Sequence, residues 1–144
     1  MAKKILFVDD EDWSVDAYFD KLRDHGLQFD LAINGDEAID RLRSEKYDLI
    51  ILDIMLPPGN KIGKDVEPRR AGAILLDMIR KKEVPDMKTS PGVLVVVLTA
   101  VTDQKLLENV RKLDVKEIFQ KPAPFDEVTE MLLTLAKNDK VAPQ

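Results

Sequence analysis

The sequence has no cysteine and only one histidine among its 144 residues. Without cysteine the protein cannot form disulfides, thiolate metal sites or a thiol nucleophile, and this composition fits a reducing cytoplasm, where we expect the protein to act. A single histidine also excludes metal sites built from several imidazoles. Long apolar runs are missing as well. The first run covers only residues 5–8 before Asp9, which is too short for a signal peptide, so we expect no membrane span.

A net positive charge is also absent, because acidic residues outnumber basic ones by 27 to 22. The formal net charge is −5, which disfavours direct nucleic-acid binding because duplex binding usually needs a basic face. Hydrophobic residues make up 44% and charged residues 34% of the chain, which is ordinary for a globular protein and argues against overall disorder. The length suits one domain, which we place at residues 1–138. Residues 139–144 are expected to form a flexible polar tail.

Five short apolar runs recur along the chain, and each is followed by a segment with helical periodicity. Several runs are continuous rather than alternating, which is typical of strands that are covered on both faces of a parallel sheet. Strand and helix alternate five times, which predicts an α/β fold: a doubly wound, five-stranded parallel sheet with five helices and right-handed crossovers. The expected strands are residues 5–8, 29–33, 49–52, 93–98 and 115–119.

Four of the five runs end in or lead to residues that can bind or transfer charged groups: Asp9-Asp10-Glu11, Asp53, Thr99-Ala100 and Lys121-Pro122. Ligands of open α/β sheets bind at the carboxyl ends of the strands, so these side chains should converge on one rim. Carboxylates about 4 Å apart repel each other by roughly 4 kcal/mol per pair at an effective dielectric constant of 20. Such a cluster needs a cation or a raised pKa, and Mg²⁺ suits an oxygen-only site with few carboxylates.

The motifs resemble those of the response regulator receiver family. The matching segments, in chain order, are Phe-Val-Asp9-Asp10-Glu, Ile-Leu-Asp53-Ile-Met-Leu-Pro57, Val-Leu-Thr99-Ala100 and Phe-Gln-Lys121-Pro122. The likeness covers about residues 3–137. It implies a flavodoxin-like fold with strand order 2-1-3-4-5, and a phosphoacceptor function in a two-component or phosphorelay system, with the chain as a stand-alone receiver.

The resemblance also implies a role for each residue. Asp53 would be phosphorylated, acting as a carboxylate nucleophile. Lys121 would neutralise charge that grows on the transferred group, and Thr99 would turn to hydrogen-bond the new phosphoryl oxygen. The peptide bond between Lys121 and Pro122 would be cis and would help to aim the lysine.

The metal ligands and the partners follow from the same resemblance. Mg²⁺ would be held by Asp10 and Asp53, by Asp9 directly or through water, and by the backbone carbonyl of Met55. The phosphoryl donor would be a sensor histidine kinase or a histidine phosphotransfer protein, and the output would be binding to a downstream protein or onward transfer in a relay. The family also offers a dimer face, made here by the apolar helix around 106–110, the strand at 115–119 and the helix around 128–135.

One departure from the family pattern is the segment 57–71. When Gly72 is matched to the glycine that opens the family's third helix, the preceding loop is longer by about ten residues, a length that is uncommon without a reason. The segment carries four basic and two acidic residues, a local net charge of +2. It is either a basic lid or docking element beside the phosphorylation site, or a tolerated surface insertion with a mobile backbone.

Three single positions also depart from the pattern. Ile118 stands where the family often has an aromatic switch residue, which puts coupled threonine–aromatic switching in doubt. Met55 and Val101 stand two residues beyond Asp53 and Thr99, where polar side chains of the family help to place an attacking water. Two apolar residues there predict a slowly hydrolysed phosphoaspartate.

Two other functions compete with the phosphoacceptor. An aspartate-nucleophile phosphatase of the haloacid dehalogenase type would use the Asp-x-Asp of residues 10–12, but it would leave Asp53 without a role and would need a later acidic pair. Only Asp126 and Glu127 are available for that pair, inside a helical pattern. The other alternative is a receiver-like interaction module that is not phosphorylated, and the full set of site residues argues against it. We therefore do not expect a turnover enzyme.

Overall fold

Alternating strands and helices build the layered α/β fold that the sequence predicts. The computed structural model describes residues 3–137, apart from the side chains of Asp12 and Trp13, so the expected tail at 139–144 lies outside the described residues. In chain order the elements are β1 (Lys4–Val8), α1 (Asp12–Asp24), β2 (Gln28–Ala32), α2 (Gly35–Ser44), β3 (Leu49–Leu52), α3 (Gly59–Ile62), α4 (Pro68–Arg80), β4 (Leu94–Thr99), α5 (Gln104–Arg111), β5 (Glu117–Gln120) and α6 (Phe125–Lys137).

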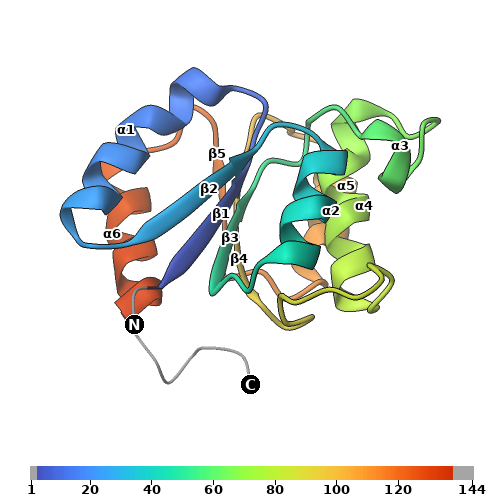
Figure 1. Ribbon diagram of the computed structural model, residues 1–144. Coiled ribbons are helices and arrows are strands. Elements are labelled where there is room, and N and C mark those ends of the chain that lie inside the picture. The colour runs from blue at the N-terminus through green and yellow to red at the C-terminus, as the bar shows by residue number, and fades with distance from the viewer. Residues whose placement is uncertain (1–2, 138–144) are drawn as a thin grey trace.

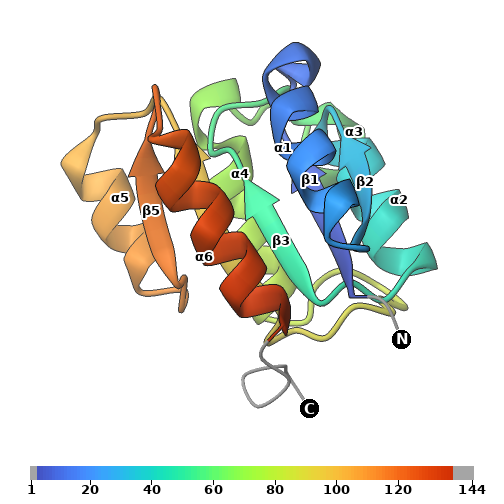
Figure 2. The same ribbon diagram turned by 90° about the vertical axis from the view of Figure 1, so that its left-hand side faces the viewer.

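The five strands form one parallel sheet in the order β2-β1-β3-β4-β5, which confirms the expected topology. Helices α1 and α6 cover one face of the sheet, and α2, α4 and α5 cover the other (Figures 1 and 2). The sequence predicted five helices, but residues 3–137 contain six, so the prediction was wrong by one. The additional helix is α3, a single turn inside the long segment after β3.

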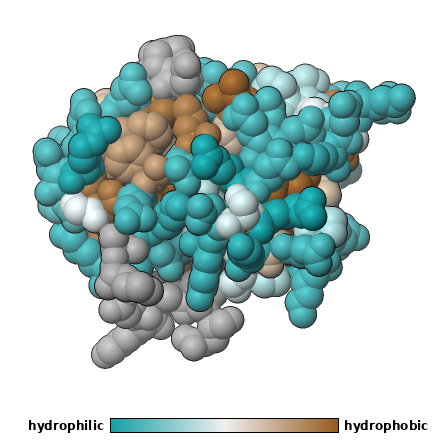
Figure 3. Space-filling model, in the orientation of Figure 1, coloured by the Kyte–Doolittle hydropathy of each residue, from teal (hydrophilic) through white to brown (hydrophobic). Residues whose placement is uncertain are grey.

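The apolar strands are buried because both faces of the sheet are covered. Successive side chains of a strand point to opposite faces. In β1, Leu6 and Val8 therefore join the core beneath α2 and α4, whereas Ile5 and Phe7 join the core beneath α1 and α6. The edge strand β2 is less covered, and hydrophobic side chains gather over α1 and β2 on the face seen in Figure 3.

The additional helix α3 is held by the first turn of α2. The Asp36 carboxylate accepts hydrogen bonds from the backbone N–H groups of Asn60 (3.2 Å) and Lys61 (2.8 Å), and these bonds lower the pKa of Asp36. Lys61 also forms an ion pair with Asp40, one turn further along α2. The first half of the long segment is thus docked on α2, where these contacts satisfy backbone groups that a short helix leaves unpaired.

No helix within residues 3–137 is long and apolar enough to cross a membrane.

Candidate functional site

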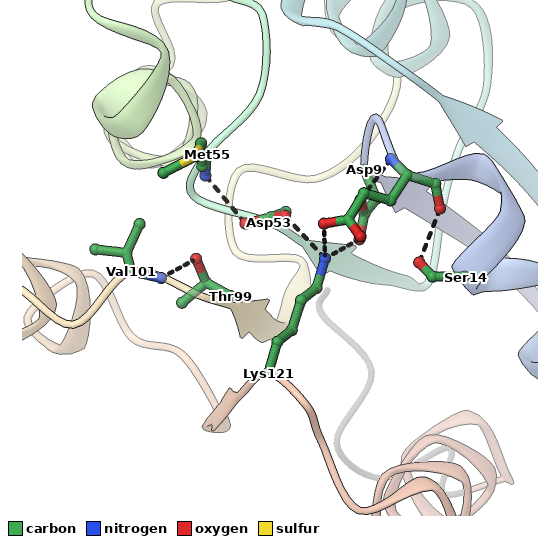
Figure 4. A network of polar contacts seen from close by, with 8 residues as sticks. Asp9, Ser14, Asp53, Met55, Thr99, Val101 and Lys121 are labelled. Carbon is green, nitrogen blue, oxygen red and sulfur yellow. Dashed lines mark hydrogen bonds and ion pairs between the residues drawn. The ribbon is translucent and has the colours of Figure 1, made fainter.

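The carboxyl ends of β1, β3, β4 and β5 bring four of the predicted residues to one rim of the sheet (Figure 4). The backbone ladder continues one residue past two of these strands. The Asp9 N–H donates to the carbonyl of Ala32 at 3.0 Å, and the Asp53 N–H donates to the carbonyl of Val8 at 2.9 Å. Both aspartates are therefore fixed by the sheet, and each is only 4% exposed.

The carboxylates of Asp9 and Asp53 are bound in the same way. Each uses Oδ1 to accept a hydrogen bond from the backbone N–H two residues later, that of Glu11 at 2.9 Å for Asp9 and that of Met55 at 3.0 Å for Asp53. Such turns are typical of aspartate at the start of a loop. Both Oδ2 atoms then face the Lys121 Nζ, at 2.9 Å from Asp9 and 3.0 Å from Asp53. The ammonium therefore bridges two buried carboxylates.

The pKa values of Asp9 and Lys121 are both raised at this site. Burial raises the pKa of Asp9, although the hydrogen bond from Lys121 opposes that change. Burial by itself would lower the pKa of Lys121, but the hydrogen bonds and charges of Asp9 and Asp53 outweigh it and raise that pKa. Lys121 is therefore a permanent ammonium at physiological pH, placed where a negatively charged group would approach Asp53.

Four acidic residues at the site could share one metal ion. Single carboxylate oxygens of Asp9, Asp10, Glu11 and Asp53 all lie within 4.8 Å of one another. An oxygen-only donor set with an exposed member, Asp10, fits a hard cation that keeps some of its water. Glu11 was not among the predicted site residues, but its Oε1 lies 3.4 Å from the Lys121 Nζ. Its position directly after the two aspartates was the only sequence signal for it.

Thr99 ends β4 inside the protein and is fully buried. Its hydroxyl oxygen accepts a hydrogen bond from the Val101 N–H at 3.2 Å, which leaves the hydroxyl proton available for another acceptor. Its carbonyl accepts the Lys121 N–H at 2.8 Å, so the backbone of Lys121 is held to the end of β4. The Lys121–Pro122 peptide bond is cis, as the resemblance implied.

The backbone of Asp53 is also packed against helix α4. The Gly72 N–H donates to the carbonyl of Ile54 at 2.8 Å. A Cβ at position 72 would lie 2.2 Å from the carbonyl oxygen of Asp53, so only glycine allows this approach. The match of Gly72 to the family glycine, and with it the extra length of about ten residues within the segment 57–71, stays a prediction.

The structure locates the remaining predicted residues but does not show their roles. Met55 contributes its N–H to Asp53, its side chain is exposed, and its carbonyl stays only a predicted metal ligand. Val101 is buried, and Ile118 is half-buried in β5. A cavity of about 450 Å³ adjoins the site, lined by Asp9, Glu11, Tyr18, Lys121 and Ala123 among others.

Comparison with known proteins identifies the family to which this fold belongs. The family model of the response regulator receiver domain matches residues 5–133. Hybrid signal transduction histidine kinase B of Dictyostelium discoideum is 29% identical over 126 residues, which cover 88% of this chain and 6% of that protein. Transcriptional regulatory protein CrdR of Helicobacter pylori is 24% identical over 141 residues, which cover 98% of this chain and 58% of CrdR. The chain thus spans only part of the length of both relatives.

A solved structure has the same fold. The receiver domain of sensor histidine kinase PA1611 from Pseudomonas aeruginosa superposes with a TM-score of 0.69 at 22% identity, covering 96% of this chain and all of that domain. That structure has a magnesium ion coordinated in its active site cleft.

Proposed function

The chain belongs to the response regulator receiver family, and on that premise we propose that it accepts a phosphoryl group on Asp53 with the help of Mg²⁺. The observation that carries the proposal is the Lys121 ammonium, which lies 3.0 Å from the Asp53 carboxylate at the rim of the sheet. A buried nucleophile beside a fixed cation suits attack on a phosphate group, whose transfer depends mainly on positioning and charge stabilisation.

The proposed metal ligands are Asp10, Asp53, Asp9 directly or through water, and the carbonyl of Met55. The close grouping of the carboxylate oxygens supports this set and adds Glu11 as a neighbour that can accept hydrogen bonds from metal-bound water. A bound Mg²⁺ would supply positive charge for the phosphoryl oxygens. Magnesium in the active site cleft of the PA1611 receiver domain supports the same choice of ion.

The chain's own residues perform the rest of the transfer. A carboxylate oxygen of Asp53 forms the new bond to phosphorus while the phosphorus–nitrogen bond of a donor phosphohistidine breaks. The Lys121 ammonium stabilises the charge on the transferred group, and the Thr99 hydroxyl donates a hydrogen bond to a phosphoryl oxygen. Because Asp53 stays modified until hydrolysis, the reaction is a regulatory modification rather than an enzymatic turnover.

The partners of this reaction follow from the family. We infer that the phosphoryl donor is a sensor histidine kinase or a histidine phosphotransfer protein, and the relationship to a hybrid histidine kinase and to CrdR supports a place in two-component signalling. The output is a change in protein binding. We also propose that the chain can dimerise through α5, β5 and α6, which correspond to the family's dimer face. We propose a cytoplasmic location as well.

The direct test is intact-mass measurement after incubation with Mg²⁺ and acetyl phosphate. The wild type should gain one phosphoryl group, and Asp53→Asn should gain none. Asp86→Asn is a matched control, because Asp86 is exposed in the loop before β4, away from the site, and its φ of 54° is one that asparagine tolerates. An unmodified wild type, or equal modification of Asp53→Asn, would overturn the proposal and favour an interaction module that is not phosphorylated.

The phosphatase alternative is less well supported. Its nucleophile would be Asp10, which is exposed, whereas the lysine of the site contacts Asp9 and Asp53. Asp126 and Glu127, the acidic pair that it would need, lie in the first turn of α6. Steady release of phosphate from a generic phosphate ester would favour that alternative.

A further inference from the structure

A groove runs between helices α4 and α5, outside the phosphorylation site. It consists of two adjoining hollows of about 260 and 230 Å³, and Arg70, Leu106 and Asn109 line both of them. The groove therefore continues from one hollow into the next along the two helices.

The first hollow is basic. Arg69, Arg70 and Lys105 line it, opposite Asp103. Arg69 is already paired, with Glu67 at 3.0 Å and with Asp103 at 3.9 Å. Arg70 and Lys105 are exposed and have no ion-pair partner among residues 3–137. Two free cations therefore face this end of the groove in a protein whose net charge is −5.

The second hollow is lined by more apolar than polar residues. Its walls include Ala73 and Ile74 from α4 and Val110 and Leu113 from the side of α5, and Asp77 lies at its edge. Leu113 packs against the hydrophobic core from the surface, whereas Ile74 is half-buried and lies outside that core. The groove thus has a basic end and a more apolar end, so its chemistry changes along its length.

The basic end derives from the long segment after β3. The first half of that segment is anchored on α2 by Asp36 and Asp40, and the second half leads into α4, which begins at Pro68. Arg69 and Arg70 follow directly, in the first turn of α4. A cation at a helix N-terminus opposes the helix dipole. Glu67 and Asp103 offset this for Arg69, whereas Arg70 has no ion-pair partner within residues 3–137 and is open to an anionic group from outside.

We propose that the α4–α5 groove docks an acidic, amphipathic segment of a partner protein. Carboxylates of the segment bind Arg70 and Lys105, since arginine offers a planar fork that matches a carboxylate. Apolar side chains of the same segment cover Ile74 and Leu113, as in other helix-in-groove complexes. A nucleic-acid duplex fits less well, because the free positive charge is limited to two residues and gives way to an apolar floor. The docking does not require phosphorylation of Asp53.

The test uses the unphosphorylated full chain and a fluorescein-labelled synthetic peptide with a glutamate-rich first half and a leucine- and alanine-rich second half. Fluorescence anisotropy should show binding that weakens as salt is added. The double variant Arg70→Glu/Lys105→Glu should bind the peptide at least about tenfold more weakly, because two attractive contacts become repulsive. Ile74→Gln should weaken binding severalfold, and the peptide with glutamine in place of glutamate should not bind.

The matched control is Lys21→Glu/Lys116→Glu, which makes the same change in net charge on α1 and before β5 and should bind like the wild type. Asp53→Asn should also bind normally, which separates this proposal from the phosphoacceptor function. Equal loss of binding in the control variant would show general charge attraction and overturn the proposal. No binding by the wild type, or self-association of the chain that disappears in Arg70→Glu/Lys105→Glu, would overturn it as well.

Discussion

Gly72→Ala isolates the contact between helix α4 and the phosphorylation site. Helix propensity alone predicts that alanine stabilises this position by about 0.5–1 kcal/mol. The packing predicts the opposite. The new Cβ would lie 2.2 Å from the Asp53 carbonyl oxygen and 2.7 Å from the Ile54 Cα. Both are backbone atoms, so no side-chain rotation can relieve the overlap.

The expected magnitude follows from the two costs. Overpacking in a well-packed interior costs about 1–3 kcal/mol. The shift that relieves it also weakens the hydrogen bond from the Gly72 N–H to the Ile54 carbonyl, which is worth about 0.5–1.5 kcal/mol. After subtraction of the propensity gain, Gly72→Ala should lower the free energy of unfolding by roughly 0.5–4 kcal/mol.

Urea unfolding measures this difference, and Gly92→Ala is the control. A Cβ at position 92 would meet only the Ser90 Oγ, at 4.0 Å, so alanine there should be neutral or slightly stabilising. The rate of modification by acetyl phosphate should fall in Gly72→Ala by about tenfold or more, because Asp53 moves with its backbone. A Gly72→Ala protein as stable as the wild type, with an unchanged rate, would refute the reasoning.

Three further predictions concern the site itself. Lys121→Met should lower the free energy of unfolding by roughly 3 kcal/mol at neutral pH, because two buried carboxylates lose their cation. Since the pKa of Lys121 is raised in the folded protein, its contribution is complete below about pH 10.5 and is lost as the pH rises towards the folded value. Urea unfolding should thus show the gap between wild type and variant closing at alkaline pH, and a gap that widens would contradict the assignment. Asp9→Asn should weaken Mg²⁺ binding by about tenfold or more in calorimetric titration, and unchanged affinity would remove Asp9 from the ligand set. Met55→Asn should shorten the lifetime of the phosphorylated protein by roughly tenfold, measured as loss of the phosphoryl mass, because a polar side chain can place the attacking water; an unchanged lifetime would show that position 55 does not control decay.

The sequence predicted the sheet and the rim because both depend on local patterns. Continuous apolar runs identify buried parallel strands, and the first polar residue after each run identifies its carboxyl end. Asp9, Asp53 and Thr99 follow from that rule, whereas Lys121 stands one residue further on, after Gln120, and was identified by its motif with Pro122. The bounds of the fifth strand were predicted less well. Residues 115–119 were expected, whereas β5 is Glu117–Gln120. The reason is that a strand at the edge of a sheet has a weaker apolar pattern.

Helix α3 could not be predicted in this way. The segment that contains it has several prolines and glycines and no helical period. The turn forms because Asp36, 24 residues before Asn60 in the sequence, accepts backbone hydrogen bonds from its first residues. Contacts of this kind belong to tertiary structure, which local propensity does not contain. The same limit applies to Glu11, whose approach to Lys121 depends on where β5 ends.

The hydrogen bonds around Thr99 show how the site is connected to α5. Ile118 has no ring or hydroxyl group that could exchange places with Thr99. Instead, the Val101 N–H donates to the Thr99 hydroxyl, and the Gln120 side chain donates to the Val101 carbonyl at 2.8 Å. If the Thr99 hydroxyl turns towards a phosphoryl oxygen, the Val101 N–H loses its acceptor and the loop must adjust. Two residues later, Asp103 caps α5 and pairs with Arg69, so the same short loop joins the phosphorylation site to the basic end of the α4–α5 groove.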